Sequence, residues 1–137
     1  MADTLDSVRD QSHGDIEHIL IDGGSNDDTN QIIEQYPHVS VHLSEKDKGI
    51  YDGLNKGLKL ATGDFVGFLH SDDYFTSNSV IQEIVEFLAA NPKLDGAYGN
   101  IVFVEDKGEK IIRKYNSEKW QFNDFKKGKM PAHPSFF

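Results

Sequence analysis

Residues 65–73 read Phe65-Val66-Gly67-Phe68-Leu69-His70-Ser71-Asp72-Asp73, an apolar run that stops at two adjacent carboxylates. The run predicts a strand over residues 64–69 that is buried on both faces. Because burying two neighbouring carboxylates is costly, we expect Asp72 and Asp73 in a loop just beyond that strand. Two carboxylates there can hold a hard divalent cation, which a diphosphate ligand needs. The alternative is that Ser71 and Asp72 only cap a turn before the next helix.

A second acidic loop occurs earlier in the chain. Residues 16–22 predict a strand that ends at Asp22, and a polar loop and a helix to about Tyr36 follow it. One of the polar residues 25–27 is expected to cap this helix. Two strand–acidic loop–helix units favour an open α/β sheet, in which ligands bind outside the carboxyl ends of the strands. The two acidic loops are therefore expected on the same edge.

Hydrophobic periodicity predicts the remaining elements. Helices are expected over residues 2–11, 50–61 and from residues 76–78 to 91, and strands over residues 39–43, 96–105 and 110–115. A hairpin turn is predicted at residues 106–108. The pattern of residues 116–137, which are aromatic and basic, assigns no element. No linker, repeat or low-complexity tract interrupts the sequence, so we expect a single domain over residues 1–137.

The composition is that of an ordinary globular domain. The 137 residues are 37% apolar and 27% charged, contain no cysteine and carry a net charge of −9. An acidic chain is unsuited to general nucleic-acid binding, so no nucleic-acid partner is expected. Without cysteine there is no disulfide or thiolate chemistry. No apolar run approaches the length of a membrane span and no signal peptide is visible, so we expect a cytoplasmic protein without a transmembrane segment.

Positive charge is concentrated late in the chain. Residues 107–129 contain eight Lys or Arg residues and three acidic residues, a local charge of +5, while the remainder carries −14. This segment is either a solvated lysine-rich surface or a patch that meets an anionic acceptor or a membrane surface. The second interpretation predicts peripheral association with the inner face of the membrane.

Five motifs occur in an order that resembles the family 2 glycosyltransferases of the GT-A fold, especially bacterial members that build surface polysaccharides. The matching segments are ILIDGGS at 19–25 with DT at 28–29, KDKGIYDGLNKG at 46–57, ATGD at 61–64 through LHSDD at 69–73, AYGN at 97–100 and HPSFF at 133–137. The resemblance implies a Rossmann-like open sheet in three α/β/α layers. It also implies an enzyme, expected to be inverting, that transfers sugar from a UDP-, GDP- or dTDP-sugar to a hydroxyl of a saccharide or lipid-linked acceptor.

The resemblance also implies a nucleotide site. The aspartate at the position of Asp22 contacts the base in the family, although Asp22 could instead only close an Asp-Gly turn. Gly24 belongs to the same nucleotide loop. Lys48, Gly49 and Asn55 would face the nucleotide from the loop and helix that follow the second predicted strand. For Lys48 the alternative is simple surface exposure, and for Gly49 it is entry into the helix.

Asp72 and Asp73 match the end of the metal-binding DXD signature of the family. The resemblance implies that they hold Mn²⁺ or Mg²⁺ and that Ser71 contacts the nucleotide; oxygen-only ligands suit either ion. Many relatives carry an acidic residue where this chain has His70. His70 would therefore contact the sugar or the ribose rather than the metal.

Two family features are absent from this chain. Family members begin with a strand before a helix like that of residues 2–11, so a sheet missing its first strand is expected. The sheet edge left exposed predicts a homodimer. The carboxylate that serves as general base usually lies beyond the HPSFF segment, where the chain stops. His133 is the one candidate base within a motif, and its alternative is a structural histidine that anchors the tail.

Two other classes of protein compete with this interpretation. One is a non-catalytic, truncated domain that binds a nucleotide or a protein partner. The other is a receiver-like phosphoacceptor domain, which also places acidic residues at strand ends. A receiver needs a lysine at the end of a late strand, and residues 102–105 contain none. A dinucleotide dehydrogenase is disfavoured because no Gly-x-Gly-x-x-Gly loop follows a strand.

Overall fold

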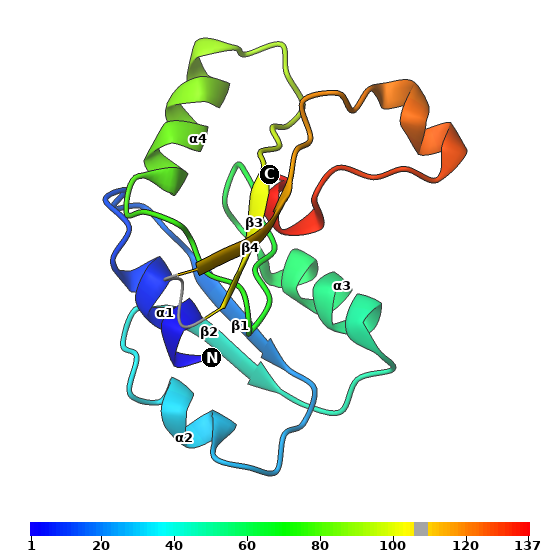
Figure 1. Cartoon of the computed structure of the whole chain (residues 1–137). Helices are drawn as coiled ribbons and strands as arrows, with labels where there is room; N and C mark the ends of the chain where they lie inside the picture. The colour runs from blue at the N-terminus through cyan, green and yellow to red at the C-terminus, as the bar shows by residue number, and fades with distance from the viewer. Residues whose placement is uncertain (106–109) are drawn as a thin grey trace.

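The structure is a computed structural model of the chain and describes residues 1–105 and 110–137. Helices and short strands alternate in the first half, and an antiparallel pair of strands and two 3₁₀ helices lie in the last third (Figure 1). In chain order the elements are α1 (Ala2–Arg9), β1 (His18–Asp22), α2 (Thr29–Ile33), β2 (Val39–Ser44), α3 (Ile50–Leu60), α4 (Val80–Ala90), β3 (Ile101–Glu105), β4 (Lys110–Tyr115), η2 (Phe122–Lys127) and η3 (His133–Ser135).

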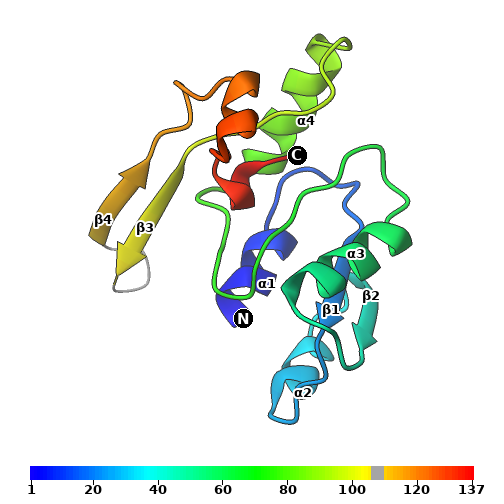
Figure 2. The same cartoon turned by 90° about the vertical axis from the view of Figure 1, so that its right-hand side faces the viewer.

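The described residues form two separate two-stranded sheets. Strands β1 and β2 are parallel, whereas β3 and β4 are antiparallel. Figure 2 shows the two sheets apart, with α1 and the green segment that precedes α4 between them. The mixture of helices and strands agrees with the expected α/β class, and a single open sheet in three layers stays a prediction.

The parallel pair forms as the sequence pattern predicts. In β2 the apolar side chains are half-buried and alternate with exposed polar ones, which is the period of a strand with one covered face. Helix α3 packs against β1 through two glycines one turn apart. A methyl group on Gly57 would lie 3.5 Å from Ile21, and one on Gly53 would lie 3.8 Å from it. These glycines therefore let the helix approach the strand closely.

The predicted strand over residues 64–69 is wrong: the structure assigns no strand there. In the described part of the chain, the β1–β2 and β3–β4 sheets both form without this segment. An apolar run becomes a strand only where a neighbouring strand offers its hydrogen-bonding edge. Phe65 is 48% exposed, so the segment is not buried on both faces either.

Several predicted boundaries also differ from the structure. Helix α2 begins at Thr29, with Asp28 at the N-cap position, and the Asp27 side chain accepts the Thr29 N–H (3.0 Å), which agrees with the expected capping by one of residues 25–27. Helix α2 ends at Ile33, before Tyr36. The strand expected over residues 96–105 is shorter: β3 begins at Ile101, and Tyr98 forms an isolated antiparallel bridge. The turn predicted at residues 106–108 lies outside the described residues.

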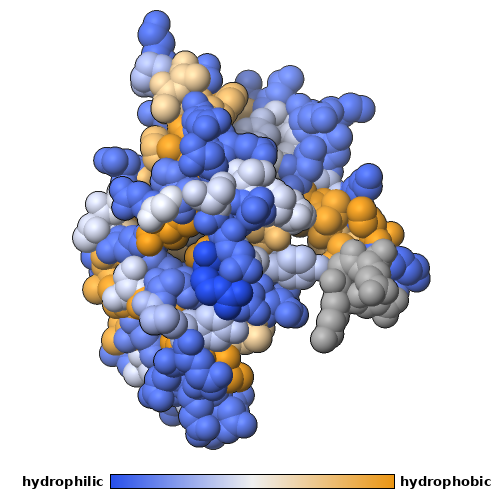
Figure 3. All heavy atoms as spheres, turned by 90° about the vertical axis from the view of Figure 1, so that its left-hand side faces the viewer, coloured by the Kyte–Doolittle hydropathy of each residue, from blue (hydrophilic) through white to orange (hydrophobic). Residues whose placement is uncertain are grey.

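The antiparallel pair of β3 and β4 keeps much of its apolar surface exposed. Phe103 is 41%, Ile111 51% and Ile112 52% exposed. Figure 3 shows apolar side chains at the surface of this face of the molecule, including a group toward its right-hand edge. Within residues 1–105 and 110–137, no helix has the length and apolarity needed to cross a membrane.

Candidate functional site

Asp22 ends β1 and is almost fully buried, with 7% of its surface exposed. Its carboxylate accepts hydrogen bonds from the Ser25 N–H (2.9 Å), the Ser25 hydroxyl (2.5 Å) and the Ser44 hydroxyl (2.6 Å). Burial acts to raise the pKa of Asp22, but the hydrogen bonds from Ser25 and Ser44 outweigh it, so the pKa lies below its ordinary value. Asp22 is therefore held as a fixed anion at the end of the strand.

The loop after Asp22 lies directly on the loop after β2. The Glu45 N–H donates to the Asp22 carbonyl (3.0 Å). A methyl group on Gly23 would come within 2.7 Å of the Asp47 carboxylate. Gly24 has a φ of +88° and its Cβ position lies 3.3 Å from the Lys46 nitrogen, so this turn requires glycine. The predicted nucleotide residue Gly24 thus lies against the loop that carries Lys48 and Gly49.

Lys48 and Gly49 lead into α3. The Lys48 N–H donates to the Asp52 carboxylate (3.0 Å), and the Gly49 N–H donates to the Asp47 carboxylate (2.9 Å). Gly49 has a φ of +116° at the start of the helix, which agrees with the helix-entry interpretation. The side chains of Lys48 and Asn55 are exposed and make no hydrogen bond within residues 1–105 and 110–137.

Sequence reasoning missed the side chains that hold these loops. Ser25 and Ser44 fix Asp22, and Asp47 accepts a backbone N–H two residues further on. An Asp-x-Gly sequence is typical of such a turn, so residues 47–49 carried a signal for it. No sequence signal pairs Ser44 with Asp22, because that contact depends on the register of β1 and β2.

The acidic pair lies in or next to a turn outside any strand, although the strand expected directly before it is absent from the described residues. The Asp73 N–H donates to the His70 carbonyl (3.0 Å). The pKa of Asp73 is raised, first by burial and then by the Asp72 carboxylate, while His70 and His133 act in the opposite direction. Asp72, His70 and His133 therefore all influence the pKa of Asp73.

His133 reaches this turn from the other end of the chain. Its ring centroid lies 5.5 Å from that of His70 and 6.2 Å from that of Phe68. The last residues are held in place by backbone pairing: Ala97 donates to the Phe137 carbonyl (2.8 Å) and Phe137 donates to the Ala97 carbonyl (2.9 Å). The predicted sugar contact, His70, and the predicted base, His133, are thus brought together.

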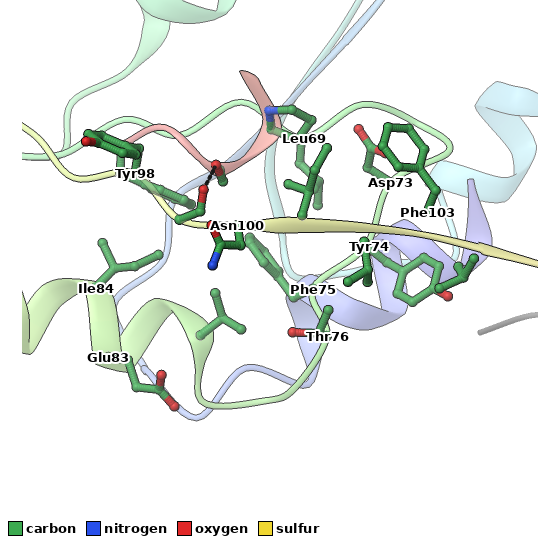
Figure 4. A pocket seen from close by; sticks show the side chains of 18 of the residues that line it. Leu69, Asp73, Tyr74, Phe75, Thr76, Glu83, Ile84, Tyr98, Asn100 and Phe103 are labelled. Carbon is green, nitrogen blue, oxygen red and sulfur yellow. Dashed lines mark hydrogen bonds between the residues drawn. The ribbon is translucent and has the colours of Figure 1, made fainter. Parts of the chain in front are cut away.

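An open pocket of about 1260 Å³ begins at the acidic pair (Figure 4). Asp73 and Phe75 line it on one side, Ile84 of α4 on another, and Asn100 and Phe103 on the side of β3. Apolar side chains predominate away from the two carboxylates. Such a pocket can accept a ligand whose anionic part lies near a cation at the acidic turn.

The predicted site residues therefore form two clusters. The first contains Asp22, Gly24 and the loop with Lys48 and Gly49, and the second contains His70, Ser71, Asp72, Asp73 and His133. No hydrogen bond or ion pair joins the two clusters in the described part of the chain.

The described residues contain no group of three or more acidic or histidine side chains placed to hold a metal. Two neighbouring carboxylates nevertheless fit Mn²⁺ or Mg²⁺, because Mg²⁺ is commonly held by one or two carboxylates together with waters and the phosphates of its ligand. The oxygen donors of Asp72 and Asp73 are of the type that both ions prefer.

Comparisons with known proteins bear on the nature of this site. The sequence model of the family described as Glycosyl transferase family 2 matches residues 1–136. A protein of Mycobacterium tuberculosis named Uncharacterized glycosyltransferase is 36% identical over 138 residues, covering 98% of this chain and 52% of that protein. A PGL/p-HBAD biosynthesis glycosyltransferase of Mycobacterium bovis is 34% identical over 102 residues, which cover 72% of this chain and 40% of that protein.

A third relative, an Uncharacterized glycosyltransferase of Haemophilus influenzae, is 35% identical over 109 residues, covering 77% of this chain and 43% of that protein. The chain thus spans about half the length of these relatives or less. The resemblance drawn from the five motifs is confirmed. The chain belongs to glycosyl transferase family 2, which implies the GT-A class of α/β fold.

Proposed function

We propose that this chain binds the nucleoside diphosphate part of a sugar donor, with Mn²⁺ or Mg²⁺, in an inverting glycosyltransferase. The observation that carries the proposal is the acidic turn, where Asp72 and Asp73 lie beside His70 and His133 at the mouth of the pocket. Membership of the family supports a sugar transfer. We also propose that the complete enzyme has the single open sheet of the family.

Different residues of the chain would bind the base, the metal and the sugar. Asp22, held as an anion by Ser25 and Ser44, can accept a hydrogen bond from a ring N–H of the base. Asp72 and Asp73 would hold the metal. When bound, that ion neutralises the charge that develops on the leaving diphosphate. Gly24, Lys48, Gly49 and Asn55 belong to loops that would lie along the nucleotide, and His70 and Ser71 to the turn beside the sugar.

In the proposed reaction an acceptor hydroxyl attacks the anomeric carbon as the bond from that carbon to the diphosphate oxygen breaks. The nucleoside diphosphate leaves with the bonding electron pair, and the hydroxyl proton passes to a general base. His133 is the candidate base of this chain because its ring lies beside His70 at the acidic turn. A saccharide or a lipid-linked molecule is the proposed acceptor; one relative is named for PGL/p-HBAD biosynthesis.

Calorimetric titration of UDP, GDP and dTDP, with and without Mn²⁺, tests the proposal. We expect one nucleotide to bind the wild-type chain only with the metal. Asp72→Ala with Asp73→Ala should weaken that binding by roughly a hundredfold or more, since the cation loses both carboxylates. Asp64→Ala with Asp95→Ala is the matched control, because it removes two exposed carboxylates outside the site.

The titration separates the proposal from its competitor. Metal-dependent binding that survives the Asp72 and Asp73 changes would contradict the proposed site. A folded wild-type chain that binds none of the three nucleotides would instead favour a domain that binds only a protein partner.

The predicted homodimer and the predicted location at the inner face of the membrane stay proposals. Among residues 1–105 and 110–137, β1 and β2 pair only with each other, and their outer edges offer a place for another strand. Light scattering over a wide range of protein concentration tests the dimer, and a constant monomer mass would exclude it.

A further inference from the structure

A row of hydrogen bonds joins residues 4–13 to residues 71–82, the segment that carries the acidic pair. The partners lie 66 to 70 positions apart in the sequence. The bonds connect Thr4 Oγ1 with the Ser71 carbonyl, Ser7 Oγ with the Phe75 N–H, Gln11 Nε2 with the Ser77 carbonyl, the Ser12 N–H with the Asn78 carbonyl, Gln11 Oε1 with the Ile81 N–H and His13 Nδ1 with Gln82 Oε1. The two segments therefore run side by side in one direction (Figure 2).

Two hydroxyl groups of α1 bracket the acidic pair. Thr4 is 6% exposed, and its hydroxyl donates to the carbonyl of Ser71 (2.8 Å), the residue before Asp72. The Ser7 hydroxyl donates its one proton to the Thr4 carbonyl (2.8 Å), so its oxygen is left to accept the Phe75 N–H (3.2 Å). The backbone is thus held on both sides of the two carboxylates.

The acidic turn has few other anchors. Residues 64–69, which precede it, belong to no strand in the described part of the chain. Within the turn, the Asp73 N–H bonds to the His70 carbonyl. Helix α1, in contrast, is fixed to the protein interior by Leu5, which is 0% exposed, and Val8, which is 7% exposed. The helix can therefore act as the rigid support of the turn.

We propose that Thr4 and Ser7 are positioning residues that set the acidic pair for the metal and the diphosphate; this inference rests on the proposed function. A turn that spends only part of its time in the competent arrangement binds its ligand more weakly by that fraction. Removing both hydroxyls leaves the Ser71 carbonyl and the Phe75 N–H without their partners. The competent arrangement then loses its two external hydrogen bonds.

The test combines two measurements on Thr4→Val with Ser7→Ala, which keeps the shape at position 4 and removes both hydroxyls. Hydrogen exchange without ligand should become faster at the Phe75 amide. The dissociation constant of the nucleotide that binds the wild type with Mn²⁺ should rise roughly tenfold. Thr4→Ser keeps its hydroxyl, so the variant with this single change should bind within about twofold of the wild type.

Val8→Ala is the matched structural control, since Val8 is buried on the same helix and makes no side-chain hydrogen bond. It should lower stability and leave the dissociation constant near the wild-type value. If Val8→Ala weakens binding as much as Thr4→Val with Ser7→Ala does, the inference is wrong. It is also wrong if that double variant binds as tightly as the wild type. Neither result would contradict the proposed function. A wild-type chain that binds no nucleotide would instead overturn the proposed function, and this inference with it.

Discussion

Replacing Leu5 by alanine is expected to lower the free energy of unfolding by about 3 kcal/mol. Leu5 is 0% exposed and is the largest fully buried side chain among the described residues. The change removes apolar contacts and leaves a cavity where α1 meets the interior. Because small domains are stable by only about 5 to 15 kcal/mol, this loss is a large share of the total. Denaturant unfolding followed by circular dichroism measures it.

Two further variants show whether burial is the cause. Leu58→Ala on α3, where the side chain is 52% exposed, should change the free energy of unfolding by about 0.5 kcal/mol or less. Leu5→Met nearly conserves volume and should cost under about 1.5 kcal/mol. If Leu5→Ala is no more harmful than Leu58→Ala, then α1 is not the buried support that the structure shows.

The local elements could be predicted from the sequence because their signals are local. The alternation of residues 39–43 and the helical spacing of residues 50–61 correspond to β2 and α3. The strand predicted over residues 64–69 failed because strand formation depends on a neighbouring edge, which no local pattern encodes. Likewise, the number of strands in one sheet depends on pairing between distant segments.

In the candidate site, too, local features could be predicted from the sequence, whereas contacts between distant segments could not. The local sequence indicates two acidic positions, Asp22 at the end of β1 and Asp72 with Asp73 in a loop. It does not indicate the supports of these residues. The Ser44 hydroxyl reaches Asp22 through the register of two strands, and the Thr4 hydroxyl reaches Ser71 across 67 positions. Such contacts become visible only once distant segments are placed side by side.

A pair of histidines lies at the opposite end of the β1–β2 pair from Asp22. His18 begins β1, His38 precedes β2, and their ring centroids lie 5.2 Å apart. Burial, followed by the charge of His38, lowers the pKa of His18 to about 4. His18 Nδ1 is buried and has no hydrogen-bond partner among the described residues. This ring is therefore held in its neutral form.

The acidic side chains near His38 do not offset the effect of burial on its pKa. The pKa of His38 is lowered, first by burial and then by Arg9 of α1, whereas Asp10 and Asp6 act to raise it. Protonation of either ring is thus less favourable in the folded protein than in the unfolded chain. Each protonation also opposes the other, because the two rings are neighbours.

Acidification is therefore expected to destabilise the protein before its carboxylates titrate. The unfolded chain protonates His18 near pH 6.5 and the folded protein only near pH 4, so the unfolded state binds more protons between these values. Stability is fully present above the unfolded pKa and falls as the pH drops toward the folded pKa. The difference amounts to about 3 kcal/mol over the whole interval and about 2 kcal/mol between pH 7 and pH 5.

Urea unfolding at pH 7 and pH 5 measures this loss in the wild type and in His18→Phe. Phenylalanine retains an aromatic ring against His38 but cannot bind a proton, so most of the difference between the two pH values should disappear. His42→Phe, at an exposed position of β2, is the matched control and should keep the wild-type difference. A wild-type chain equally stable at both pH values would show that the unfolded state gains no proton over the folded one, and that His18 is not held neutral by burial.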